Sequence, residues 1–187
     1  MKTHIVPAIL MTFATFVVLV VIYPLIVWGF AQFAPEQGRG ETVSVNGKIV
    51  GFARVGQKFT EDKYFWSRPS AVAYNAAGSG GSNKGPSNPE YLAQVQARID
   101  TFLVHNPTVQ KSDIPSELVT ASGSGLDPNV SPQGAEVQIA RIAKIRNLPE
   151  NRLKTLVQLH TEEPLLGLFG PAKVNILALN IALDNLK

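Results

Sequence analysis

The residues whose types and spacing most suggest chemistry lie in two loops rich in glycine and serine. The first, GSGGSNKGPSNP at residues 78–89, contains four Gly and two Pro, and the second, SGSGLDPNVSP, occupies residues 122–132. Glycine lets backbone N–H groups approach a phosphate, so both loops are candidates for contact with a nucleotide or with a partner protein. The candidate residues are Ser79, Gly80, Gly81, Ser82 and Asn83 in the first loop and Ser122, Gly123, Ser124 and Gly125 in the second.

The first loop does not fit the phosphate-binding Walker A motif. That motif has the form GxxxxGK followed by Ser or Thr. Counted from Gly78, the sixth residue is Asn83, and Lys84 is followed by Gly85. No predicted strand leads directly into the loop either. A surface loop or a subunit contact is therefore the favoured interpretation.

Side chains that often perform catalysis or bind metals are present, but their spacing does not match a known site. His105 and His160 have no second His or carboxylate at metal-ligand spacing, and HTEE at residues 160–163 lacks the second His of an HExxH motif. The serines are not in a GxSxG turn, and the chain has no Cys. The sequence predicts no catalytic residue and no metal site. It also predicts that Asp127 forms a turn before Pro128, and that five basic residues lie on solvated faces: Arg141, Lys144, Arg146, Arg152 and Lys154.

A third candidate is the aromatic sequence YFWSRPSA at residues 64–71. Three consecutive aromatic residues fit neither a helical nor a strand period, and Pro69 favours an extended conformation at Arg68. A corner of the core with an arginine stacked on an aromatic ring is the favoured interpretation. Contact of Phe65, Trp66 and Arg68 with a partner is the alternative.

These candidates follow an N-terminal stretch, Ile5 to Pro35, that contains no Asp, Glu, Lys or Arg. Because about 20 apolar residues in a helix cross a bilayer, this stretch predicts a transmembrane helix over about residues 7–30. A cleaved signal sequence is an alternative, but the apolar run is too long and the best cleavage site, at Ala34, is poor. A buried helix of a soluble core would need a much larger domain. Within the span, Pro24 and Trp28 are the candidates for contact with neighbouring helices and with the membrane interface.

The charge bias that would orient this span is thin. Lys2 precedes it, and Arg39 follows it together with Glu36 and Glu41. We expect the large C-terminal part to cross the membrane, which divides the chain into an anchor segment at residues 1–35 and an extracytoplasmic domain at residues 36–187. The domain carries 16 of the 17 basic residues and all 14 acidic residues. This balance excludes nucleic acid as a partner, because phosphate-binding proteins concentrate basic charge.

The domain is predicted to be mixed α+β. Asn46-Gly47 between two β-rich runs, Thr42–Val45 and Lys48–Val55, predicts a type I′ hairpin. Apolar periodicity predicts further helices at residues 87–106, capped by Ser87 and Glu90, at residues 131–147 and at residues 148–161. Val174 and Ile176 suit a short strand that leads into a C-terminal helix.

Several long motifs together resemble one known family, the C subunit of the Kdp-type potassium-transporting P-type ATPase. They are YFWSRPSAVAYN, GSGGSNKGPSNP, DIPSELVTASGSGLDPNVSP, QIARIAKIRNL and VQLHTEEPLLGLFGPAKVNILALNIALD. They follow the family's order, and the resemblance covers nearly the whole chain, including the span.

The resemblance implies a single-pass protein of the bacterial inner membrane with a periplasmic domain. Its implied partners are a channel-like potassium-translocating subunit, a P-type ATPase subunit and a very small membrane peptide. The family's C subunit is described as an assembly factor and a catalytic chaperone that raises the ATP affinity of the pump subunit. No cofactor is implied for this chain itself, and ATP would act through the pump subunit. The chain has no DKTGT motif, since Asp62-Lys63 is followed by Tyr64.

Two alternatives to this function remain at this point. A membrane-anchored hydrolase or binding protein that acts alone is suggested only by the Ser- and Gly-containing loops. A domain that caps the extracellular entrance of the channel-like subunit is the other. A periplasmic domain would meet no cytosolic ATP, so an effect on ATP affinity would have to pass through helix packing in the membrane.

Overall fold

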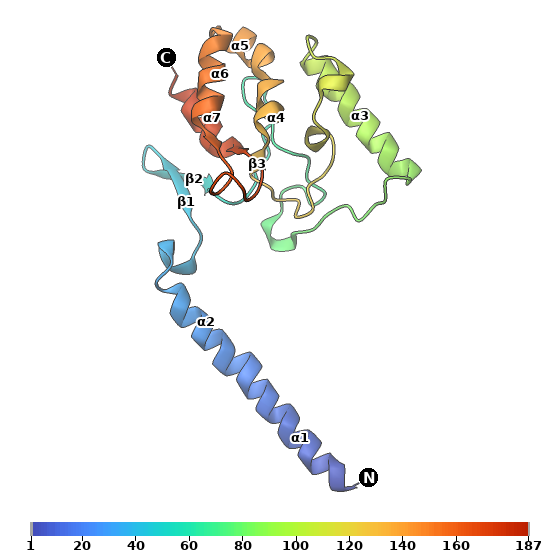
Figure 1. Ribbon diagram of the computed structural model, residues 1–187, viewed down its shortest axis with the longest axis vertical. Helices are drawn as coiled ribbons and strands as arrows, with labels where there is room; N and C mark the ends of the chain where they lie inside the picture. The colour runs from blue at the N-terminus through green and yellow to red at the C-terminus, as the bar shows by residue number, and fades with distance from the viewer. Residues whose placement is uncertain (1, 187) are drawn as a thin grey trace. The chain divides into compact units, whose positions relative to one another are not determined.

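The structure is a computed structural model that describes residues 2–186, and it confirms the predicted fold class: an apolar N-terminal helix followed by a mixed α+β domain (Figure 1). The chain divides into two compact units, Met1–Glu41 and Thr42–Lys187. Each unit is described separately below.

The first unit is one long apolar helix. It comprises α1 (Lys2–Phe16), the π-helical stretch η1 (Val17–Ile22) and α2 (Tyr23–Ala31). His4–Ala31 is 28 residues long with a mean hydropathy of 2.8, which is long and apolar enough to cross a membrane. None of its most apolar stretch is buried within the protein.

The π-helical stretch lies directly before Pro24. Proline offers no N–H, and its ring clashes with the carbonyl four residues earlier in a regular α-helix. The turn is wider here, because the N–H of Tyr23 donates to the carbonyl of Val18, five residues back. Pro24 therefore occupies the first turn of α2, where a missing donor is tolerated. A short 3-10 turn, η2 (Pro35–Gly38), follows the helix.

The second unit begins with the predicted hairpin. Strands β1 (Thr42–Val45) and β2 (Lys48–Phe52) pair antiparallel, with Val45 opposite Lys48. Asn46 and Gly47 both have positive φ, 50° and 76°, as a type I′ turn requires. The hairpin is confirmed, although β2 ends at Phe52 rather than at Val55.

Helix α3 (Pro89–His105) confirms the next predicted helix but not its cap. The N-cap is Asn88, whose Oδ1 accepts from the N–H of Tyr91 at 2.9 Å. The predicted capping box of Ser87 and Glu90 is wrong, because Glu90 Oε2 instead forms an ion pair with Lys84 Nζ at 2.6 Å. A Pro directly after Asn88 fixes the start of the helix, since proline suits the first helical position.

The rest of the domain packs four helices with a small sheet. The sheet has the antiparallel order β3-β5-β4, from Asn129–Val130, Lys173–Asn175 and Thr161–Glu162. The helices are α4 (Pro132–Glu136), α5 (Ile139–Arg146), α6 (Glu150–Leu159) and α7 (Ile176–Asp184). Figure 1 shows α4 to α7 gathered on one side of the domain and α3 on the other. The fully buried side chains at the centre include Phe65, Ile142, Leu153, Leu179 and Leu183.

The predicted helix at residues 131–147 is two helices. It breaks between Glu136 and Ile139, at Val137 and Gln138. Gln138 is fully buried and uses its side chain to pair with the backbone of Trp66. The predicted strand at Val174 and helix from Ile176 are both confirmed, with Asn175 as the cap between them.

Candidate functional site

The segment Asp62–Trp66 runs through the domain without a neighbouring strand, and buried side chains satisfy its backbone instead. Asn180 Oδ1 accepts from the N–H of Phe65 at 2.9 Å, and Asn180 Nδ2 donates to the carbonyl of Phe65 at 3.0 Å. Gln138 Oε1 accepts from the N–H of Trp66 at 2.7 Å. Asn180 and Gln138 thus act as the strand partner that this segment lacks, because a buried backbone polar group must find a partner.

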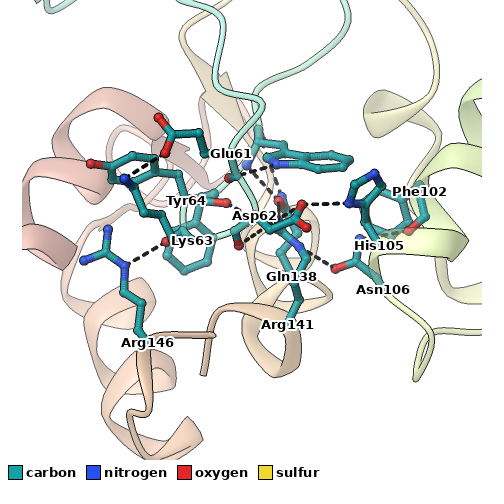
Figure 2. A network of polar contacts seen from close by, with 12 residues as sticks. Glu61, Asp62, Lys63, Tyr64, Phe102, His105, Asn106, Gln138, Arg141 and Arg146 are labelled. Atoms are coloured by element: carbon teal, nitrogen blue, oxygen red, sulfur yellow. Dashed lines mark hydrogen bonds and ion pairs between the residues drawn. The ribbon is translucent and has the colours of Figure 1, made fainter. Parts of the chain in front are cut away.

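Arg141 is the centre of this network (Figure 2). Its side chain is only 2% exposed. It donates to Asn106 Oδ1 at 3.0 Å, to Gln138 Oε1 at 2.8 Å, and to the carbonyls of Asp62 and Tyr64. Burial lowers the pKa of Arg141 to about 10, while the nearby Asp62 carboxylate acts in the opposite direction. Its guanidinium also lies over the Trp66 ring, 4.6 Å from the centroid.

The prediction that Arg141 and Arg146 lie on solvated faces is wrong. Arg146 is 17% exposed, donates to the carbonyl of Lys63 at 2.8 Å and pairs with Asp184 at 2.6 Å. Its guanidinium lies over Tyr64. Helix α5 therefore places two arginines against one extended segment. The one available signal was that Arg141 directly precedes Ile142, on the apolar face of the predicted helix.

Asp62 and His105 join this network to α3. His105 Nδ1 lies 2.8 Å from Asp62 Oδ1, and the His105 ring meets the Trp66 ring edge-on with centroids 4.9 Å apart. Oδ1 of Asp62 is buried but accepts no well-aligned hydrogen bond.

The three residues of the aromatic candidate have separate surroundings. Phe65 is fully buried in the core. Trp66 is partly exposed and packs on Phe102 and His105. Arg68 Nη1 pairs with Asp127 Oδ2 at 2.9 Å. The stacked arginines are thus Arg141 and Arg146, on Trp66 and Tyr64.

The two glycine- and serine-rich loops lie against each other. The N–H of Gly80 donates to the carbonyl of Ser124 at 2.8 Å, and Ser79 Oγ donates to the same carbonyl at 3.0 Å. Gly81 packs so closely on Gly123 that a Cβ would lie 3.1 Å from the Gly123 carbonyl oxygen. Gly125 has a φ of +68° and no room for a Cβ, which would meet Val72 at 2.6 Å. These contacts join the two loops into one double loop through Ser79, Gly80 and Gly81 of the first and Gly123, Ser124 and Gly125 of the second. The other three candidates, Ser82, Asn83 and Ser122, lie in the same two loops.

A surface that sequence reasoning missed is the turn Pro164–Pro171. Leu165 and Phe169 form an isolated β-bridge, and the N–H of Leu168 donates to the carbonyl of Leu165 at 3.2 Å. The turn nevertheless leaves four large apolar side chains in solvent: Leu165, Leu166, Leu168 and Phe169 are 69%, 81%, 80% and 63% exposed. The sequence PLLGLFGP was the available signal, since it is an apolar run between two prolines.

In the first unit, Trp28 is 64% exposed and Pro24 lies in the first turn of α2. Among the described residues, no group of three or more His, Asp or Glu side chains is placed to hold a metal ion.

The architecture fits a protein with a single-pass membrane anchor: one apolar helix long enough to span a membrane, then an α+β domain whose buried polar groups serve its own backbone. The comparisons with known proteins agree. A family model described as "K+-transporting ATPase, c chain" matches residues 5–185. The chain belongs to this family, and it is a non-catalytic subunit of the Kdp potassium-uptake ATPase, as the resemblance predicted.

Curated relatives support the assignment over nearly the full length. The potassium-transporting ATPase KdpC subunit of Flavobacterium psychrophilum is 58% identical over 95% of this chain and 95% of its own. That of Flavobacterium johnsoniae is 59% identical over the same shares. That of Polaromonas naphthalenivorans is 46% identical over 100% of this chain and 97% of its own.

Proposed function

We propose that the chain is the accessory and assembly subunit through which the complex raises the ATP affinity of its pump subunit. Its partners in this role are the channel-like potassium-translocating subunit, the P-type ATPase subunit and the small membrane peptide. Membership of the family supports the complex itself. The apolar surfaces that the fold leaves uncovered support a role in assembly.

The observation that carries the assembly role is the turn Pro164–Pro171. Four exposed large apolar side chains within five residues form the kind of patch that marks a contact surface. Leu166 adds a second argument, because its φ of 55° lies in the left-handed region that favours Gly or Asn. A leucine that is 81% exposed gains little from the fold in return. We infer that this turn docks on an apolar surface of a partner subunit.

The anchor helix also leaves its apolar side chains uncovered by the rest of the chain. None of the most apolar stretch of His4–Ala31 is buried within the chain. We propose that lipid and partner helices cover it, and that Pro24 and the residues around it contact a partner helix. We also propose that Trp28 lies near a membrane interface, where amphipathic rings are common.

We further propose that the large domain is periplasmic in a bacterial inner membrane, with the anchor at residues 1–35 and the domain at residues 36–187. The double loop then acts as scaffold or partner contact rather than as a nucleotide cradle. This is supported by its geometry, because the N–H groups of Gly80 and Gly125 already donate to Ser124 and Ser122. In this arrangement the effect on ATP affinity passes through packing between membrane helices.

Two experiments test the proposal. The chain truncated after Glu41 is co-expressed with the other subunits, and the apparent ATP affinity of the purified complex is compared with that of the complete complex. A lowered ATP affinity in the truncated complex supports a role of the domain in the effect. An unchanged affinity contradicts a role of the domain and leaves the effect to the anchor helix alone. A compartment-specific tag after Lys187 reports the side of the membrane, and a cytoplasmic signal would contradict the periplasmic assignment.

A further inference from the structure

An open groove lies between the segment at residues 58–74 and helix α3. It has a volume of about 500 Å³, and its apolar floor comes from Phe59, Trp66, Phe102 and Leu118. Every ionisable side chain lining it, apart from Tyr74, is basic or a histidine: Lys58, Arg98 and His105. No carboxylate of the described residues lines it. The groove therefore favours an anion that also has an apolar part.

The three nitrogen-bearing side chains keep donors for such a ligand. Lys58 is exposed and pairs with no carboxylate among residues 2–186. Arg98 Nη1 donates to the carbonyl of Val119 at 3.0 Å, and the other N–H groups of Arg98 have no acceptor among the described residues. Asp62 lies against Nδ1 of His105, so Nε2 is the nitrogen left for a ligand.

The hydroxyl groups of the groove, in contrast, are largely engaged within the chain. Ser67 Oγ donates to the carbonyl of Gln57 at 2.7 Å, Thr101 Oγ1 donates to the carbonyl of Ala97 at 2.9 Å, and Tyr74 Oη donates to the carbonyl of Arg68 at 2.5 Å. Few neutral groups remain to recognise a sugar or a base. The remaining chemistry is that of cations beside aromatic rings.

One wall of the groove is held in an unusual backbone conformation. Ala73 and Tyr74 are consecutive non-glycine residues with φ of 52° and 59°. Ser70 Oγ accepts from the N–H of Tyr74 at 2.9 Å and so holds this turn. Left-handed conformations at such residues are strained and cluster where structure serves a site.

We propose that this groove binds an extended acidic peptide segment of a protein partner. Carboxylates of the segment lie against Lys58, Arg98 and His105, and a neighbouring apolar side chain packs on Trp66 and Phe102. The proposal goes beyond the assembly role argued above, because neither the turn Pro164–Pro171 nor an effect on ATP affinity requires it.

The test uses the full chain, purified alone in mild detergent, so that its outcome is independent of ATPase activity. The probe is a fluorescently labelled peptide, Gly-Leu-Asp-Phe-Glu-Leu-Gly with blocked ends, and binding is read by fluorescence anisotropy. Its partner probe carries Asn and Gln in place of Asp and Glu. We expect the acidic peptide to bind at least about tenfold more tightly than the amide peptide, and more weakly as salt rises.

Variants locate the binding. Lys58→Gln should weaken binding of the acidic peptide about threefold, and Lys58→Gln with Arg98→Gln about tenfold or more. Lys154→Gln, an exposed lysine of α6 outside the groove, is the matched control and should leave the affinity unchanged. Circular dichroism melting of each variant checks that the fold is intact.

Four outcomes would overturn the proposal. They are no binding of the acidic peptide, equal binding of the acidic and amide peptides, equal effects of Lys58→Gln and Lys154→Gln, and displacement of the peptide by ATP or by phosphatidylglycerol vesicles at lower concentration than by unlabelled peptide. The last would assign the groove to a phosphate-bearing ligand instead.

Discussion

The guanidinium of Arg141 lies 4.6 Å from the centroid of the Trp66 ring, in the interior of the domain. Through this contact a residue of α5 fixes the segment that separates the core from the groove. Trp66 in turn packs on Phe102 and His105 of α3, with ring centroids at 6.3 Å and 4.9 Å. Arg141 therefore links α5 to α3, and it does so mostly by serving backbone carbonyls and side-chain amides.

Replacement of Arg141 by methionine should destabilise the domain severely. The change keeps much of the side-chain volume but leaves the carbonyls of Asp62 and Tyr64 and the Asn106 side chain without their donor. Loss of a buried charged donor costs about 3 kcal/mol or more, which corresponds to a melting temperature lower by roughly 10 °C. Melting of the full chain in detergent, followed by circular dichroism, measures this.

Arg141→Lys should rescue little of that stability, because an ammonium cannot reproduce the planar fork of a guanidinium. Lys144→Met, in the same helix but exposed, is the control and should change stability by less than about 0.5 kcal/mol. Equal melting temperatures for Arg141→Met and Lys144→Met would contradict the central role of Arg141.

Asn180→Ala should be similarly disruptive through a different group. Asn180 is 2% exposed and pairs with both the N–H and the carbonyl of Phe65. Without it two buried backbone groups lose their partners, at a cost of about 2–4 kcal/mol in the free energy of unfolding. Asn185→Ala, at the exposed end of the same helix, provides the comparison, and thermal melting that failed to separate the two variants would refute this reading of Asn180.

The partners of Phe65 and Trp66 show which contacts cannot be predicted from the sequence. The hairpin was predictable because Asn46-Gly47 favours a type I′ turn by itself. The apolar helix was predictable because the run from Ile5 to Pro35 has no charged residue and is long enough to span a membrane. Asn180 and Phe65 are 115 residues apart, and Gln138 and Trp66 are 72 apart. Nothing local in the sequence pairs them.

The burial of Arg141 and Arg146 could not be predicted for a related reason. Arg141 and Lys144 look alike in a sequence, as basic residues on one predicted helix, yet one is buried and the other exposed. The difference comes from the segment 62–66, whose unpaired carbonyls need a donor. The double loop was predictable as two loops, but their mutual contact depends on tertiary packing.

That contact yields a prediction with an internal control. Gly125→Ala should destabilise the domain by about 2 kcal/mol, because the residue has a φ of +68° and its Cβ would meet Val72 and the Gly80 carbonyl at 2.6 Å and 2.8 Å. Gly123→Ala, two residues earlier in the same loop, has no atom within 4 Å of its added Cβ and should be nearly neutral. Melting temperatures of the two variants decide, and equal values would mean that the loops do not pack as described.

Alkaline pH should weaken the fold partly through Tyr74. Burial raises the pKa of Tyr74 above its usual value. Above about pH 10 the unfolded chain loses this proton before the folded chain does, so the stabilising contribution is present below the unfolded pKa and disappears as pH rises through the folded pKa.

The measurement compares unfolding of the parent and Tyr74→Phe between pH 8 and pH 11, a range of about three units around the usual tyrosine pKa. The stability of the variant should fall less steeply than that of the parent at the alkaline end. Arg141, whose pKa is lowered to about 10, has the opposite slope but is common to both proteins, so the difference between them isolates Tyr74. Parallel curves would contradict the prediction.

The exposed turn allows stability and assembly to be separated with one substitution. Leu166→Asn should raise the stability of the isolated chain slightly, by about 0.5 kcal/mol, because Asn tolerates the left-handed conformation better than Leu does. The same change removes an apolar side chain that is 81% exposed. We therefore expect less of the channel-like and pump subunits to co-purify with the variant, although the variant itself melts at the same or a higher temperature.

The control is Leu159→Asn, which removes an apolar side chain outside the turn. Leu159 is the last residue of α6 and is 76% exposed. Full co-purification with Leu166→Asn, or equal losses with both variants, would remove the turn from the contact surface.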